Sequence, residues 1–261
     1  MSYSLKVLYS GSTGNAAMLT DGKTTVLIDA GRSAKVLCNA LLAAGTSPDA
    51  ISAIFLTHEH SDHTSALEVF LKRHPVPVHV AGASAARLLA RPGDHLRNAI
   101  LAHPPLFSHT VGQFNFQSFC TSHDSAESVG YRITYTDPAD GSLHSIGYAT
   151  DLGIVAPSVE TALSGCEAIV LECNHDPEML LTGPYPADLK RRIASRKGHL
   201  SNPDCAAFAS RLASCGMKRL LLAHLSETNN LPELAFGEVK AALADTNVHI
   251  TVASPDAVVE L

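Results

Sequence analysis

A short segment of the sequence carries side chains of the kinds that bind metal ions: His58, His60, Asp62 and His63. The apolar run before it, residues 51–56, predicts a buried strand. Because side chains two positions apart at the end of a strand point the same way, His58 and His60 can face one ion together. Asp62 and His63 follow after the chain has turned, so they can face a second ion beside the first.

The ligand types of this segment restrict its chemistry. Imidazole and carboxylate suit zinc, and also manganese, iron or cobalt. Two such ions a few ångströms apart can share a hydroxide, so the pattern predicts a hydrolase. A histidine-rich surface turn is the alternative, and it would suit a lone pair of histidines. The full motif between a strand and a helix favours a metal site.

In sequence order these residues spell H-x-H-x-D-H, the motif of the metallo-β-lactamase superfamily. The chain resembles the ribonuclease Z and YycJ/WalJ-like branches of that superfamily more than its lactamases, over nearly its whole length. The resemblance implies an α/β fold, the four-layer αβ/βα sandwich of two mixed sheets flanked by helices, as a single domain over residues 1–261. Local patterning by itself supports only an α/β fold with mixed strands.

The resemblance implies three further metal ligands near the ends of predicted strands: His123, Asp151 and His224. On the residues alone, His123 would be a hydrogen-bonding loop residue and Asp151 a cap for a helix running on from Ile154. The superfamily has a bridging aspartate at the latter position, and a carboxylate has the two oxygens that this needs. The implied sets are His58, His60 and His123 for one ion and Asp62, His63 and His224 for the other, with Asp151 shared. The implied cofactors are two divalent ions, Zn²⁺ or Mn²⁺, with iron as a further candidate.

Four residues are candidates for catalysis: Asp62, Glu172, His175 and His199. His199 stands in an H-x-S setting that looks like the H-S-T element of ribonuclease Z, whose histidine assists phosphodiester cleavage. It would protonate the leaving oxygen or stabilise the phosphoryl oxygens. Glu172 and His175 lie in an L-E-x-N-H-D string that resembles the YycJ-like branch. They could equally cap a loop where the predicted strand 168–171 ends.

Two aspartates are expected to support the metal ligands: Asp29 and Asp124. Asp29 ends the predicted strand 24–28, at the place where the superfamily has an aspartate that supports the metal-binding loop. Its alternative role is to cap the predicted helix 33–44.

Candidate substrate contacts lie in two segments. The composition of residues 10–15 favours a plain turn, although the YycJ-like branch begins with a similar S-G-S-x-G-N element near its active site. The stretch 189–202 is strongly basic and could guide a nucleic-acid backbone toward the metals. As a generic charge run it would be a solvated helix face. The candidates are Ser12, Gly14, Asn15, Lys190, Arg191, Arg192, Arg196 and Lys197.

Composition sets broader limits. The net charge of −6 gives no overall basic field, so a nucleic-acid site would have to be local. Six cysteines without a C-x-x-C pair predict reduced thiols. The N-terminus lacks a signal-peptide pattern and no segment reaches the length of a membrane span, so we expect a cytoplasmic protein. The oligomeric state stays open, with a homodimer as one option.

The resemblance implies phosphodiester hydrolysis, exonucleolytic on DNA and suited to DNA repair. Transfer-RNA processing is disfavoured, because the chain has no insertion like the long arm with which ribonuclease Z grips tRNA, and no room for a β-CASP domain. The alternative activity is hydrolysis of a small ester, thioester or lactone, as in glyoxalase II-like relatives. A noncatalytic nucleic-acid-binding scaffold is the alternative outside enzymes, but such members usually lose ligands.

Other elements follow from periodicity. A strand marked by Phe114, Phe116 and Phe119 is expected to contain a bulge, because the third phenylalanine breaks the alternation. Helices are expected at 65–73, 83–91, 203–213 and 232–244. Five histidines lack ligand spacing, and most of them are expected at the surface or as hydrogen-bonding loop residues: His74, His79, His95, His103 and His109.

Overall fold

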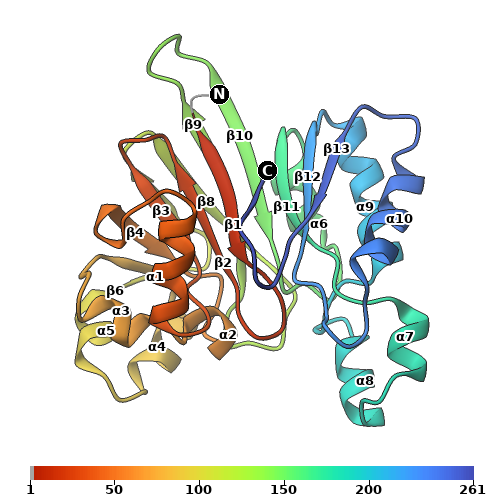
Figure 1. Cartoon of the computed structure of the whole chain (residues 1–261), viewed down its shortest axis with the longest axis horizontal. Coiled ribbons are helices and arrows are strands. Elements are labelled where there is room, and N and C mark those ends of the chain that lie inside the picture. The colour runs from red at the N-terminus through yellow and green to blue at the C-terminus, as the bar shows by residue number, and fades with distance from the viewer. Residues whose placement is uncertain (1–2) are drawn as a thin grey trace.

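The computed structural model describes residues 3–261, whose strands form two mixed sheets of seven strands each (Figure 1). The first sheet has the order β14-β1-β2-β3-β4-β5-β6, and the second β13-β12-β11-β10-β9-β8-β7. The strands of the first are β1 (Ser4–Tyr9), β2 (Ala16–Thr20), β3 (Thr25–Ile28), β4 (Ile51–Phe55), β5 (Val78–Ala81), β6 (Ile100–His103) and β14 (Val259–Glu260). Those of the second are β7 (Ser108–Val111), β8 (Phe114–Cys120), β9 (Val129–Thr136), β10 (Leu143–Ala149), β11 (Ala168–Glu172), β12 (Arg219–Ala223) and β13 (His249–Val252).

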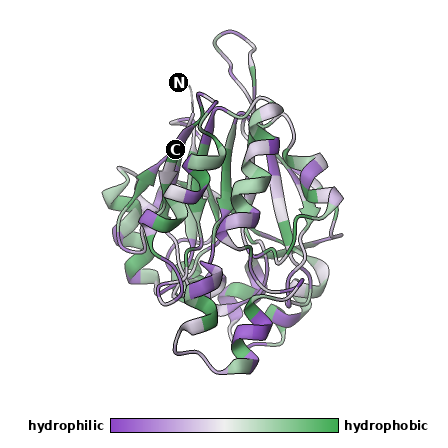
Figure 2. Ribbon diagram, turned by 90° about the vertical axis from the view of Figure 1, so that its right-hand side faces the viewer, coloured by the Kyte–Doolittle hydropathy of each residue, from purple (hydrophilic) through white to green (hydrophobic). Residues whose placement is uncertain are grey.

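Helices cover the outer face of each sheet (Figure 1). The first sheet carries η1 (Pro48–Ala50), α1 (Ala34–Ala43), α2 (Ser61–Thr64), α3 (Leu67–Leu71), α4 (Gly82–Leu89) and α5 (Asp94–Ala99). The second carries α6 (Pro157–Leu163), α9 (Asn202–Ser214) and α10 (Pro232–Ala242), and α7 (Pro177–Thr182) and α8 (Ala187–Ile193) project at one end. Three apolar clusters fill the space between the sheets and under each helix layer, and hydrophobic residues gather on the strands between the layers (Figure 2). The predicted four-layer sandwich is confirmed. No helix among residues 3–261 is long and apolar enough to cross a membrane.

The direction of the strands explains why the candidate site residues lie at one edge of the sheets. In the first sheet β3 and β4 run parallel, and in the second β10, β11 and β12 run parallel. The carboxyl ends of parallel strands meet at one edge of a sheet, which is the usual place for polar side chains in α/β folds. The segments after β3, β4, β8, β10 and β12 carry Asp29, the His58 turn, His123, Asp151 and His224 respectively, and Glu172 is the last residue of β11.

Helix boundaries revise two predictions. Ser33 caps α1, because its hydroxyl accepts a hydrogen bond from the amide of Val36, so Asp29 is not the cap. The helix after Asp151 begins only at Pro157, so Asp151 caps no helix. The predicted helix 65–73 is observed in shorter form as α3, and α2 precedes it.

The bulge predicted in β8 is wrong. β8 pairs with β9 in continuous register from Phe114 to Cys120. Phe114 and Phe116 face the core between the sheets, whereas Phe119 faces the other side and packs under the helices. The apparent break in alternation arises because both faces of this strand are covered, so apolar residues are favoured on both.

The surface position predicted for His79 is also wrong. His79 lies on β5, which is paired with β4 and β6, and it is 1% exposed. Its ring stacks on Phe55 with centroids 4.5 Å apart, and its Nδ1 is 2.9 Å from Nε2 of His103. An interior strand position buries this histidine together with its neighbours Val78 and Val80.

Gly31 allows the closest backbone approach near the His58 turn. A Cβ at this position would overlap the carbonyl oxygen of Asp62, and the loops on either side are joined by backbone hydrogen bonds between Ala30 N and His63 O and between Asn15 N and Asp62 O. We predict that Gly31→Ala lowers the free energy of unfolding by about 1–3 kcal/mol, because the two backbones must separate. Chemical denaturation measures this.

A matched control lies on α10. Gly237 is exposed, and a Cβ there would meet no atom within 4 Å. Gly237→Ala should leave stability unchanged or raise it by up to ~1 kcal/mol, since alanine is the better helix former. Equal stability of the two variants would contradict the role given to Gly31.

Candidate metal centre

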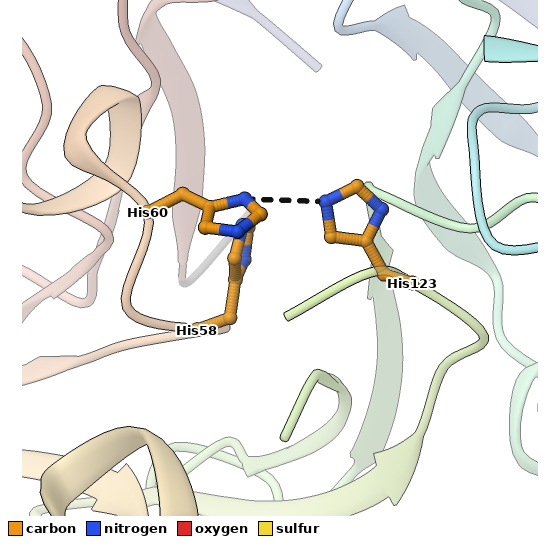
Figure 3. A group of neighbouring side chains, drawn as sticks. All are labelled: His58, His60 and His123. Carbon is orange, nitrogen blue, oxygen red and sulfur yellow. Dashed lines mark hydrogen bonds between the residues drawn. The ribbon is translucent and has the colours of Figure 1, made fainter. Parts of the chain in front are cut away.

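Three histidine side chains from distant parts of the chain converge in one group (Figure 3). His58 and His60 lie on the turn after β4, and His123 lies in the segment between β8 and β9. Nδ1 of His60 is 3.3 Å from Nε2 of His123, and the ring centroids of His58 and His123 are 5.0 Å apart. One ligand atom of each lies within 4.8 Å of the others, so a single ion could contact all three.

A second group beside the first combines carboxylates with imidazoles: Asp62, His63, Asp151 and His224. Nε2 of His63 lies 3.1 Å from Oδ2 of Asp62 and 3.2 Å from Oδ2 of Asp151. Oδ1 of Asp151 is 3.7 Å from Nε2 of His224 and 3.7 Å from Nε2 of His123, which belongs to the first group. Asp151 therefore stands between the groups, as a bridging carboxylate must. The structure brings the predicted ligands together, and their binding of ions stays a prediction.

Hydrogen bonds orient four of these histidines. Each engages one ring nitrogen with an oxygen atom outside the groups, which leaves the other nitrogen for an ion. The pairs are His58 Nδ1 with Thr57 Oγ1 (3.0 Å), His63 Nδ1 with Asp29 Oδ2 (2.8 Å), His123 Nδ1 with Gly198 O (3.2 Å) and His224 Nδ1 with Glu172 Oε1 (2.8 Å). In each pair Nδ1 is the donor, so the lone pair of a neutral ring lies on Nε2.

The free nitrogen of His58 tests whether metal ions fit this site. His58 is fully buried, and its Nε2 has no hydrogen-bond partner in the described part of the chain. A buried polar atom without a partner costs about 1–3 kcal/mol. A divalent cation would satisfy this atom, and a set of imidazole and carboxylate ligands suits zinc, manganese or iron. The residues present therefore fit the predicted ions.

Backbone strain is concentrated at three positions of the site. Asp29, Asp151 and His224 have positive φ angles of 62°, 57° and 57°, in the left-handed region that non-glycine residues seldom adopt. Asp29 and His224 directly follow β3 and β12, and Asp151 follows β10 after one residue. Strain of this kind costs of order 1–3 kcal/mol per residue and persists only where surrounding contacts enforce it. Here it turns each side chain toward its neighbours in the site.

In the second group, burial and the neighbouring carboxylates have opposite effects on the pKa values of the histidines. Burial alone lowers the pKa of His63, but the carboxylates of Asp151, Asp29 and Asp62 outweigh burial and raise it well above the usual value. Burial likewise lowers the pKa of His224, and the same kind of carboxylate neighbours, led by Asp151, raise it to about 10. These histidines therefore hold protons when no cation is bound. Metal binding must displace those protons.

Glu172 stands behind two histidines. It is fully buried, and its carboxylate accepts hydrogen bonds from Nδ1 of His199 and Nδ1 of His224, each at 2.8 Å. The amides of Leu152 and Leu200 donate to its other oxygen. Burial raises the pKa of Glu172, but these histidines outweigh burial and lower it to about 2. Glu172 does not line the cavity, so its geometry is that of a positioning residue.

A cavity of about 220 Å³ opens over both groups. His199 lines it, and so do Asp124 and Arg192, which form an ion pair. Asp124 Oδ1 is also 3.3 Å from Nε2 of His123, so this carboxylate stands beside the first group rather than behind it. His175 is buried and does not line the cavity.

The loop at residues 10–15 is part of the site. The hydroxyl of Ser10 accepts a hydrogen bond from the amide of His224 (2.8 Å), and Nδ2 of Asn15 lies 3.4 Å from Nε2 of His63. Ser12 lines the cavity. The loop is therefore more than the plain turn that its composition favours, because its polar atoms reach the metal-binding residues.

Most of the predicted basic contacts do not face the cavity. Lys190 donates to the carbonyl oxygen of Leu181, and Arg191 pairs with Asp188. Among the basic residues of this stretch, Arg192 lines the cavity. The predicted contacts outside the lining are Gly14, Asn15, Lys190, Arg191, Arg196 and Lys197.

Some functional neighbours escaped the sequence analysis. The hydroxyl and amide of Thr57 both donate to Asp29. Buried Glu59 accepts hydrogen bonds from Ser84 and from the amide of Ala126, so it secures the segment of His123. Glu59 lies within the H-x-H-x-D-H segment and Thr57 lies directly before it, so their positions were an available signal. No such signal marked Ser84, because its hydrogen-bond partner Glu59 is far away in the sequence.

Comparisons with known proteins identify the family of this chain. Residues 24–225 match a family model described as a beta-lactamase superfamily domain. Exodeoxyribonuclease YycJ of Bacillus anthracis is 34% identical over 250 residues, covering 94% of this chain and 90% of that protein. Exodeoxyribonuclease WalJ of Streptococcus pneumoniae is 32% identical over 254 residues, covering 96% and 91%.

Solved structures share the fold. The metallo-beta-lactamase fold protein YhfI from Bacillus subtilis superposes with a TM-score of 0.74 at 19% identity, covering 99% of each chain. The short form of human tRNase Z superposes with a TM-score of 0.64 at 17% identity, covering 98% of each.

Glu172 provides a test of the oriented histidines. We predict that Glu172→Gln lowers zinc affinity about 10- to 100-fold, because glutamine offers one acceptor oxygen in place of two and misorients His224. Competition with a chromogenic chelator measures the affinity. Glu238→Gln, an exposed change on α10, is the control, and an equal affinity of the two variants would contradict the assignment.

Proposed function

The chain belongs to the metallo-β-lactamase superfamily, and from that premise we propose that it is a dinuclear-metal-dependent phosphodiesterase that degrades DNA from an end. The observation that carries the proposal is the pair of adjacent ligand groups with Asp151 between them, opening into one cavity with His199. The names of the relatives, which match over nearly their whole length, support the choice of DNA.

The proposed ions are Zn²⁺ or Mn²⁺, with iron as a further candidate. His58, His60 and His123 would hold one, Asp62, His63 and His224 the other, and Asp151 both. When bound, such ions supply a nucleophile from water near neutral pH and positive charge beside the phosphoryl oxygens.

The side chains of the protein perform the remaining steps. His199 has its Nδ1 held by Glu172, which leaves Nε2 to give a proton to the leaving oxygen or to bind a phosphoryl oxygen. Arg192, at the cavity, would bind a phosphate next to the bond that breaks. Asp62, part of the second group, would also orient the attacking water.

A second function is favoured by one observation. Part of the cavity lining is apolar, formed by Leu189 and Ile193 together with Tyr185, and the acyl group of a small ester, thioester or lactone could contact it. The guanidinium of Arg192 at the cavity favours the phosphodiester, because such a group binds a phosphate. A noncatalytic scaffold would have no use for a complete ligand set, so it ranks last.

Removing the shared carboxylate tests catalysis. We predict that Asp151→Ala, loaded with zinc or manganese, loses cleavage of end-labelled single-stranded DNA by several orders of magnitude, because both ions lose a ligand. The product ladder on a gel measures this. Asp245→Ala, an exposed change, should cleave like the wild type. Undiminished cleavage by metal-loaded Asp151→Ala would refute the proposal.

Arg192 distinguishes the two substrates. Arg192→Ala should weaken DNA binding and reduce the slope of log affinity against log salt by about 1, because one phosphate contact is lost. Hydrolysis of a small ester should not change. Arg191→Ala on the same helix is the matched control, since Arg191 pairs with Asp188 away from the cavity. An unaltered salt slope for Arg192→Ala would count against the nuclease.

A further inference from the structure

Two histidines at the cavity share one carboxylate but lie on separate segments of the chain. His199 and His224 each engage Oε1 of Glu172 through Nδ1 at 2.8 Å, and their ring centroids are 5.1 Å apart. His224 directly follows β12, whereas His199 lies between α8 and α9. The shared carboxylate fixes one atom of each ring. The relative position of the two segments therefore depends on further contacts between them.

A pair of buried asparagines joins the two segments. Asn202 is the first residue of α9, and Asn230 directly precedes Leu231, the N-cap of α10. The two asparagines are 2% and 4% exposed. Nδ2 of Asn202 donates to Oδ1 of Asn230, and Nδ2 of Asn230 donates to Oδ1 of Asn202, both at 2.9 Å. Each amide thus donates to and accepts from the other, which fixes both their distance and their orientation.

The same pair contacts the backbone that follows Glu172. Nδ2 of Asn230 donates to the carbonyl oxygen of Cys173 at 3.0 Å. The thiol of Cys173 donates to Oδ1 of Asn202 at 3.1 Å. The pair therefore joins the three segments that carry the carboxylate and its two histidines.

Packing alone does not require polar side chains at these positions. Replacing both partners of a buried hydrogen bond by apolar groups of the same shape is nearly neutral or even stabilising. Buried amides whose hydrogen bonds are all made instead specify one arrangement of the groups around them. Asn202 and Asn230 contact the segments of the shared carboxylate and of both histidines, so the arrangement that they specify includes the site.

We propose that Asn202 is a positioning residue for the reaction. Through its pair with Asn230 it holds the segment of His199 so that this histidine faces the cavity in line with its task. The inference rests on the proposed phosphodiesterase activity, in which His199 gives a proton to the leaving oxygen or binds a phosphoryl oxygen. Asn202 itself does not line the cavity, so it acts through His199.

The metal ligand His224 has supports of its own. Its backbone amide donates to Oγ of Ser10 at 2.8 Å, and its carbonyl oxygen accepts from Nδ2 of Asn174 at 2.7 Å. These bonds remain when the pair of asparagines is broken. Loss of the pair should therefore displace His199 and leave the metal ligands in place.

Asn202→Leu breaks the pair with little other damage. Leucine has the branched shape of asparagine without its polar atoms. Asn230 keeps other partners, because its Nδ2 still reaches the carbonyl oxygen of Cys173 and its Oδ1 still accepts from the amide of Leu231 at 3.0 Å. The variant therefore leaves no unpaired amide at Asn230. Asn202→Ala is a second variant that removes the same contact with a smaller side chain.

The first experiment measures cleavage of end-labelled single-stranded DNA by the full-length protein loaded with zinc or manganese. Asn202→Leu and Asn202→Ala should lower kcat about 10- to 100-fold, the effect expected when a reacting group is displaced by about 1 Å. KM and zinc affinity should stay within about 2-fold of wild type, because no contact to substrate or metal is lost.

A control separates position from stability. Leu41→Ala creates a cavity in the apolar cluster under α1, on the other sheet, and should destabilise the fold. Its kcat should equal that of wild type at a temperature where it is folded. An unchanged kcat in both Asn202 variants would overturn the proposal, and so would an equal loss of kcat in Leu41→Ala.

The second experiment needs no activity. In the zinc-loaded protein labelled with ¹⁵N-histidine, the Nδ1–H protons of His199 and His224 are held by buried Glu172 and should exchange slowly with water. The His199→Gln variant assigns the first signal. Asn202→Leu should lose the signal of His199 to exchange and keep that of His224.

The two experiments distinguish failure of the positioning role from failure of the proposed function. If wild type cleaves no DNA, the phosphodiesterase is refuted, and a selective loss of the His199 signal still supports the role of Asn202. If wild type cleaves DNA and the His199 signal is unchanged in both Asn202 variants, the positioning role is refuted and the phosphodiesterase stands.

Discussion

The buried carboxylate of Asp29 is the constraint on which the metal-binding turn depends. It accepts hydrogen bonds from the amide and hydroxyl of Thr57 and from Nδ1 of His63, and every one of these groups lies in the interior. An ionised carboxylate in an apolar interior is costly unless such donors surround it. The turn after β4 can therefore adopt few conformations that satisfy Asp29. The conformation that it adopts directs Nε2 of His63 toward Asp62 and Asp151.

Glu172 plays the same part in the other half of the chain. It accepts from His199, from His224 and from two backbone amides. Each sheet thus carries one buried carboxylate at a strand end, and each carboxylate orients histidines toward the common edge. The halves are joined nearby, because the hydroxyl of Tyr131 donates to the carbonyl oxygen of Leu56 and the amide of Val129 donates to that of Thr57.

These supports hold an arrangement that is unfavourable by itself. Asp29, Asp151 and His224 have left-handed backbones, and Nε2 of His58 is buried without a partner in the described residues. The packing of the two sheets and the hydrogen bonds to the buried carboxylates offset the free-energy cost of these features. Bound cations would relieve part of the remaining cost, so metal affinity and folding are coupled at this edge of the sandwich.

The types of ligand and their places at strand ends can be read from the sequence alone. The spacing of His58, His60, Asp62 and His63 is local, and an apolar run before a polar residue marks the end of a strand, so both can be read along the chain. The family resemblance added the order of the distant ligands and the sandwich.

The contacts between side chains of distant elements are evident only in the tertiary structure. It placed Glu172 behind His199, and it brought Arg192 but not Arg191 to the cavity. It also buried His79 and turned Phe119 to the helix side of its sheet. Residue patterns report whether a side chain favours water or the core. They do not report its partner when that partner lies on another strand or helix, because such contacts depend on how the two sheets pack.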